Sequence, residues 1–138
     1  MINKILIAYD GSESADHAYS FALDLAGKYQ AELFVLTVAR PPEFAEDVET
    51  EAVIENSKRH HEELLVPLKD QAASLGLRAQ LEVAVGHPAE QIIFHAEQYG
   101  VDLVVLGHRG KSLLKRLLLG SVSKRVIQYA DCPVLVVR

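Results

Sequence analysis

The stretch that decides the fold is VDLVVLGHRG, residues 101–110, in which an apolar run ends in a loop with two glycines. A buried strand followed by such a loop is typical of α/β proteins, which hold phosphate groups between the loop and the N-terminus of the next helix. Nine residues separate Gly110 from the pair Gly120-Ser121, which leads into a predicted helix, 122–130. The sequence therefore predicts a nucleotide-binding site at this loop.

The residue types of the loop suit an anion. Gly107 and Gly110 lack a Cβ atom, so their backbone N–H groups can approach a phosphate at angles that other residues resist. The hydroxyl of Ser121 and the unpaired amides at the start of the helix, from Val122 onward, add further donors. His108 lies inside the loop, where we expect its ring to reach a phosphate.

Positive charge is concentrated around the same loop. No acidic residue lies between Asp102 and Asp131, although the whole chain carries a net charge of −5. Six basic residues fall in this interval: Arg109, Lys111, Lys115, Arg116, Lys124 and Arg125. Local basicity in an acidic protein favours a polyanionic ligand. The overall acidic balance of the chain argues against nucleic acid as the principal partner.

Several common nucleotide motifs are missing from the sequence. The P-loop motif G-x-x-x-x-G-K-[ST] would need glycine at position 105, but that residue is Val105. The dinucleotide-binding motif G-x-G-x-x-G does not occur either. The motifs S-G-G-x-D-S and H-I-G-H are missing as well. A Walker-type NTPase, a dinucleotide dehydrogenase, a pyrophosphatase and a class I synthetase are therefore disfavoured.

Composition bounds the architecture. A chain of 138 residues with 49% hydrophobic and 24% charged residues predicts a single soluble domain over 1–138. No apolar run approaches the roughly 20 residues of a membrane span, and no signal peptide is visible. A single cysteine, Cys132, allows no internal disulfide and suits a reducing compartment. We expect a cytoplasmic protein that binds no membrane, with Cys132 packed rather than nucleophilic.

Apolar runs alternate with helical patterns along the chain. Strands are predicted at 5–9, 33–38, 77–85, 101–106 and 134–137. Helices are predicted at 14–29, 52–75, 89–99 and 122–130, with an acidic loop or frayed helix at 43–51. Pro67 lies inside the second helix, where we expect a kink or a break. Strands separated by helices imply an open parallel sheet with helices on both faces, a Rossmann-like α/β fold.

The role expected for each aspartate depends on the end of the strand at which it lies. Ligands of open α/β sheets bind beyond the carboxyl ends of the strands, where the strand order reverses. Asp10 ends the first predicted strand, and its carboxylate can accept hydrogen bonds from ribose hydroxyls. Its alternative role is a cap on the first helix, which Ser12 can already provide. Asp102 and Asp131 precede strands and are assigned structural roles.

The histidines do not indicate a metal site. His60 and His61 are adjacent on a predicted helix and point about 100° apart, with no second pair of ligands at i+4. We expect His17 and His95 on helix surfaces. No residue is assigned a catalytic or metal-binding role.

Five short motifs follow one another along the chain. They are DGS at 10–12, GHPAE at 86–90, DLVVLG at 102–107, GSV at 120–122 and CPVLVV at 132–137. In this order they resemble the universal stress protein family over the whole chain. The chain also carries the complete G-x2-G-x9-G-[ST] motif of the family's ATP-binding branch, from Gly107 to Ser121.

This resemblance implies a sheet order of 3-2-1-4-5 and a site for ATP, or for AMP or ADP, with Mg2+. It implies that Asp10 contacts the ribose, that Val38 contacts adenine through its backbone, and that Ala8 and Leu106 line the base and ribose. The residues that it implies for the phosphates are Gly107, Gly110, Gly120, Ser121 and Val122.

The resemblance also implies a homodimer. Residues 134–137 form an apolar strand at the edge of the predicted sheet, and pairing with the same strand of a second copy would cover it. A monomer edge covered by its own chain is the alternative. We interpret the protein as an ATP-responsive dimeric regulatory or stress-response protein. Two alternatives stay open: a slow ATP hydrolase or phosphotransferase, and a partner-binding regulator whose nucleotide is structural.

Overall fold

The computed structural model describes residues 1–41, 48–108 and 119–138. Strands and helices alternate along these ranges: β1 (Lys4–Ala8), α1 (Glu13–Tyr29), β2 (Glu32–Ala39), α2 (Val48–Ser74), β3 (Ala79–Val85), α3 (Pro88–Tyr99), β4 (Leu103–Gly107), α4 (Ser121–Tyr129) and β5 (Val134–Val137). Within the described ranges, no helix combines the length and apolarity that crossing a membrane requires.

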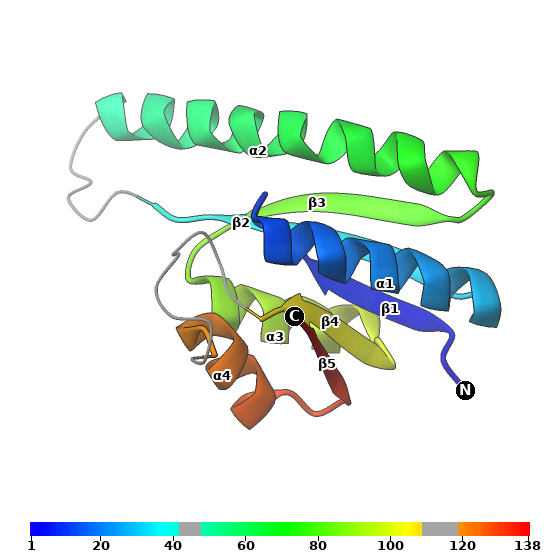
Figure 1. The fold of residues 1–138 in the computed structure, drawn as a ribbon. Coiled ribbons are helices and arrows are strands. Elements are labelled where there is room, and N and C mark those ends of the chain that lie inside the picture. The colour runs from blue at the N-terminus through cyan, green and yellow to red at the C-terminus, as the bar shows by residue number, and fades with distance from the viewer. Residues whose placement is uncertain (42–47, 109–118) are drawn as a thin grey trace.

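The strands form one parallel five-stranded sheet in the order β3-β2-β1-β4-β5 (Figure 1). Side chains of α1 and α2 pack on one face of the sheet, and side chains of α3 and α4 pack on the other. The fold is therefore the predicted Rossmann-like α/β architecture. From β1 the chain moves outward through β2 to β3, then returns to the other side of β1 with β4, so the strand order reverses between β1 and β4.

The central strand explains the apolar runs of the sequence. Ile5, Leu6 and Ile7 of β1 are each 0% exposed. Ile5 and Ile7 pack with residues of α1 and α2, whereas Leu6 packs with residues of α3. A strand that is covered on both faces must be apolar at successive positions, and this is why no period-two alternation is seen in β1.

Capping residues set the ends of the helices. The N-cap of α1 is Ser12, whose Oγ accepts a hydrogen bond from the N–H of Ala15 at 3.1 Å. Pro88 occupies the first position of α3, where proline is favoured because that position needs no N–H donor. Gly100 ends α3 in the left-handed conformation at φ 62°, which glycine adopts without strain.

The helix α2 differs from its prediction in two ways. It begins at Val48, inside the segment expected to be a loop or frayed helix, and it continues through Pro67 without a break (Figure 1). Pro67 lies on the exposed side, while Leu65 and Leu68 on the opposite side are 4% and 5% exposed. Packing of these leucines against the sheet outweighs the cost of an interior proline, roughly 3 kcal/mol.

Candidate functional site

A cavity of about 620 Å³ lies at the carboxyl ends of β1, β2 and β4. Its volume is in the range of small-molecule sites, and it stands where the strand order reverses. Eight of the eleven residues predicted for the site line it: Ala8, Asp10, Val38, Leu106, Gly107, Gly120, Ser121 and Val122. The structure thus brings together residues that are more than a hundred positions apart in the sequence.

Of the other three predicted residues, only His108 belongs to the described part of the chain. His108 is 8% exposed and does not line the cavity. Its N–H donates to the carbonyl oxygen of Val137 at 2.7 Å, and its own carbonyl oxygen accepts from the N–H of Gly120 at 3.1 Å. The backbone of His108 therefore joins β4 to β5 and to the start of α4. Arg109 and Gly110 lie outside the described residues.

Asp10 lies two residues after the end of β1, just before the N-terminus of α1. Its Oδ1 accepts a hydrogen bond from the N–H of Ser12 at 2.9 Å. Since Ser12 itself caps α1, the carboxylate of Asp10 is not the helix cap. Its Oδ2 has no hydrogen-bond partner within the described part of the chain, which leaves one carboxylate oxygen able to accept from a ligand hydroxyl at the cavity wall.

The N-terminus of α4 forms a second wall of the cavity. Gly120 is the N-cap, and the bond from Lys124 N–H to Gly120 O opens the helix. The amides that precede this bond have no partner inside the helix, and the positive end of the helix dipole lies with them. The Oγ of Ser123 donates to the carbonyl oxygen of Gly107 at 3.0 Å and ties this wall to β4. The wall is suited to an anion.

Gly107 has a packing role that the sequence did not reveal. A Cβ atom at this position would lie 2.8 Å from the carbonyl carbon of Ser14 and 2.9 Å from its oxygen. Backbone atoms cannot yield as a flexible side chain would. The first turn of α1 can therefore approach the end of β4 this closely only because residue 107 is glycine.

A further wall of the cavity, built by α2, was not predicted from the sequence. Ser57 and His61 line the cavity, together with Arg40 at the end of β2. The Nδ1 atom of His61 lies 2.7 Å from the carbonyl oxygen of Ser57. The signal that could have found His61 is helical spacing, because it stands four and seven positions before Leu65 and Leu68, which are buried on the sheet.

His95 was expected on a helix surface, and that expectation is wrong. The residue is 8% exposed, and its Nε2 lies 3.5 Å from Oε1 of Glu82 on β3. Tyr99 also donates a hydrogen bond to Glu82. The carboxylate on the neighbouring strand gives the imidazole a partner, so the ring can be buried. These residues join α3 to β3 and do not line the cavity.

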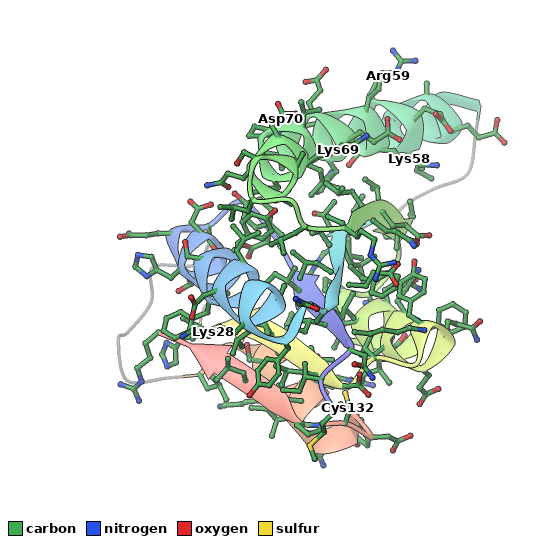
Figure 2. All side chains as sticks on the ribbon, turned by 90° about the vertical axis from the view of Figure 1, so that its right-hand side faces the viewer. Lys28, Lys58, Arg59, Lys69, Asp70 and Cys132 are labelled. Atoms are coloured by element: carbon green, nitrogen blue, oxygen red, sulfur yellow. The ribbon has the colours of Figure 1, made fainter. Side chains whose placement is uncertain are left out.

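Asp102 and Cys132 have the structural positions that the sequence indicated. The carboxylate of Asp102 accepts hydrogen bonds from the N–H groups of Asn3 and Lys4, which lowers its pKa. Cys132 lies just before β5 and is partly buried against the core beneath α3 and α4, and burial raises the pKa of its thiol (Figure 2). A thiol with a raised pKa is a poor nucleophile at neutral pH.

The described ranges contain no group of three or more His, Cys, Asp or Glu side chains that could hold a metal ion. The cavity itself contributes one carboxylate, that of Asp10, and one imidazole, that of His61. The described lining therefore offers hydrogen-bonding groups and helix amides rather than a ready set of metal ligands.

The chain was compared with known proteins. Residues 1–138 match the family model described as "Universal stress protein family". Universal stress protein YxiE of Bacillus subtilis is 39% identical, and the match covers 100% of both chains. Universal stress protein UspA from Lactobacillus plantarum has a TM-score of 0.91 at 25% identity, over 99% of this chain and 98% of that chain.

Two further solved structures are complexes. The universal stress protein from Archaeoglobus fulgidus in complex with dAMP has a TM-score of 0.66 at 20% identity and covers 100% of both chains. A universal stress protein in complex with cAMP has a TM-score of 0.66 at 23% identity, over 99% of this chain and 97% of that chain. At these identities the two structures establish a shared fold.

Proposed function

The chain belongs to the universal stress protein family, and from that premise we propose that it binds an adenine nucleotide, ATP in the first place, in the cavity at the carboxyl ends of β1, β2 and β4. In this proposal the protein acts as a cytoplasmic regulatory or stress-response protein that responds to the bound nucleotide. The observation that carries the proposal is the position of Asp10, between an apolar wall and the N-terminus of α4.

The order of the strands gives the ligand a direction. The ends of β2, β1 and β4 lie side by side, and neighbouring strands are about 4.8 Å apart. In the proposed arrangement the base lies by Val38 at the end of β2, the ribose by Asp10 after β1, and the phosphates by Gly107 and the amides of α4. Each part of the nucleotide then meets the chemistry that suits it: apolar surface, a carboxylate acceptor, and unpaired N–H donors.

The relatives support an adenine base. The two complexes described above contain dAMP and cAMP, which share adenine and a phosphate. The basic residues around the loop and its glycine motif support the binding of a triphosphate. Two residues of the motif, Arg109 and Gly110, lie outside the described residues. Because Asp10 is assigned to the ribose, Mg2+ would be held chiefly by the phosphates themselves, as is common for this ion.

The substitution Asp10→Ala tests the proposal. It should weaken ATP, ADP and AMP by a similar factor, about 1.5 to 3 kcal/mol, because a hydrogen bond to a charged acceptor is lost at a part that all three share. Calorimetric titration measures the three affinities. A hundredfold excess of ATP over Kd should also stabilise the wild-type protein by about 2.7 kcal/mol in thermal melts.

The matched control is Asp24→Ala, which removes the same charge from α1 at an exposed pair with Lys28, far along the helix. Its nucleotide affinities should equal those of the wild type. Wild-type protein without any nucleotide-dependent change in melting temperature would refute the proposal. A loss confined to ATP would instead place Asp10 at the metal or the γ-phosphate and support phosphoryl chemistry.

A homodimer through β5 is the second part of the proposal. The strand forms one edge of the sheet, and Val134, Leu135 and Val136 remain partly exposed there. An apolar edge strand is prone to pair with another strand. Two-fold pairing with the same strand of a second copy would bury these side chains in a closed assembly.

A further inference from the structure

His61 continues the stripe of α2 that faces the sheet. Leu65, Leu68 and Ala72 of this stripe are buried against the core, and His61 stands one turn before Leu65. The charged side chains of Arg59 and Asp70, by contrast, point away from the sheet (Figure 2). Because α2 runs antiparallel to the strands, its first half lies near the carboxyl end of β2 (Figure 1). The same face of α2 therefore packs on the core from Leu65 onward and lines the cavity at His61.

A hydrogen bond sets the tautomer of the neutral imidazole ring. The Nδ1 atom lies 2.7 Å from the carbonyl oxygen of Ser57, one turn earlier in α2. A carbonyl oxygen can only accept, so Nδ1 must carry the hydrogen. In the neutral ring the other nitrogen, Nε2, is then an acceptor without a hydrogen. His61 thus brings a hydrogen-bond acceptor of fixed type to the cavity.

In the arrangement proposed above, His61 lies on the wall of the cavity that faces the base. Val38 and Arg40 at the end of β2 line the cavity with His61, whereas the anion-binding amides of α4 follow β4 on the other side of β1. Purines differ at the 6-position: adenine carries an amino donor there, and guanine carries an oxygen acceptor. Arg40 is a donor and can serve N7, an acceptor that both purines share.

We propose that His61 is a specificity-determining residue of the nucleotide site, in which Nε2 accepts a hydrogen bond from the 6-amino group of adenine. The proposal rests on the adenine nucleotide site proposed above and adds to it the residue that selects the base. A 6-oxo purine would place its oxygen against Nε2, so that two acceptors meet and the hydrogen bond is lost. Selection against 6-oxo purines follows from this contact.

The pair AMP and IMP tests the contact, because the two nucleotides differ in the amino or oxo group at the 6-position. Wild-type protein should bind AMP about tenfold more tightly than IMP, the value of one hydrogen bond at a partly buried site. His61→Phe keeps an aromatic ring and removes both nitrogens, so the ratio should fall several-fold below that of the wild type. Calorimetric titration with each nucleotide gives the ratio directly.

Two further variants separate recognition from a purely structural role. His61→Gln places an amide at similar reach, which can accept from an amino group or donate to an oxo group. It should restore AMP binding above the level of His61→Phe and raise IMP binding as well. His60→Phe makes the same change at the exposed neighbouring position and should keep the wild-type ratio.

The outcomes distinguish this proposal from the proposed function. Equal binding of AMP and IMP by the wild type would overturn the role of His61 and leave the nucleotide site standing. A wild-type ratio retained in both His61→Phe and His61→Gln would overturn it as well. Wild-type protein that binds neither AMP nor ATP would refute the site itself, and with it the role of His61. Circular dichroism shows that each variant is folded.

Discussion

Asp102 is the residue that anchors the start of β1. Its Oδ2 accepts hydrogen bonds from the N–H groups of Asn3 at 2.8 Å and Lys4 at 3.0 Å, and these bonds hold its pKa below the ordinary value of 3.8. Because the pKa is lower in the folded than in the unfolded protein, the stabilisation is complete above the unfolded value. It is lost as the pH falls through the folded value.

Asp102→Ala should therefore destabilise the protein at pH 7 by about 1 kcal/mol, through the loss of the acceptor for two backbone amides. The difference from the wild type should narrow as the pH falls below 4, where the wild-type carboxylate takes up a proton. Urea unfolding at pH 7 and at pH 3 measures both free energies. Asp131→Ala, at an exposed aspartate near β5, serves as the control. A penalty of the same size at both pH values would contradict the assignment.

At the scale of elements, the close approach of α1 to the end of β4 depends on one missing side chain. Gly107→Ala would place a methyl group 2.8 Å from the backbone of Ser14 and push the helix from the strand. We expect a loss of about 1–3 kcal/mol in the free energy of unfolding, the usual cost of overpacking. Nucleotide binding should weaken too, since α1 and β4 both border the cavity.

The control for this change is Gly27→Ala, also a glycine to alanine replacement. Gly27 lies within α1, and a Cβ atom there would meet nothing within 4 Å. Alanine is the better helix former, so this variant should gain about 0.5–1 kcal/mol. Denaturant unfolding of the two variants shows whether the free energy of unfolding falls in Gly107→Ala and rises in Gly27→Ala. If Gly107→Ala were as stable as the wild type, the helix would have to be free to shift.

Elements with one dominant signal could be predicted from the sequence. The apolar run at 5–9 identified β1 as a strand, and the helical pattern at 89–99 identified α3 within one residue of its start at Pro88. The break that Pro67 suggested does not occur in α2, because a local preference was outweighed by the packing of two leucines on the sheet. Tertiary contacts of this kind are not visible in a local pattern.

The candidate site was predictable to the extent that its residues follow strands. The cavity brings together Asp10, Val38 and Gly107, which all come at or just after strand ends, and the sheet order came from the family resemblance. His61 was missed because it lies in the middle of a helix and not after a strand, whereas Arg40 directly follows β2 and was overlooked. The place of His61 in the cavity depends on where α2 crosses the end of β2, which is a property of the packed helix.

At the scale of the whole molecule, β5 offers the edge through which we propose that two copies pair. Val136→Lys would place a charge in that contact and should convert a dimer into a monomer. Sedimentation at tens of micromolar should show a dimer for the wild type and a smaller species for the variant. Val85→Lys, at the exposed end of the opposite edge strand β3, should remain dimeric. A wild type that sediments as a monomer would refute the pairing.

The distribution of the cavity walls along the chain determines when, during synthesis, the protein can first bind the proposed nucleotide. They extend from Ala8 to Ser123, so neither half of the chain contains the whole cavity. During synthesis the N-terminal segments emerge first, and contacts between distant segments form late. A ribosome-bound chain that stops before α4 would lack the wall that the N-terminus of this helix forms. In the proposed function, loading with nucleotide would thus report that translation has passed α4 and that β1, β2 and β4 have assembled.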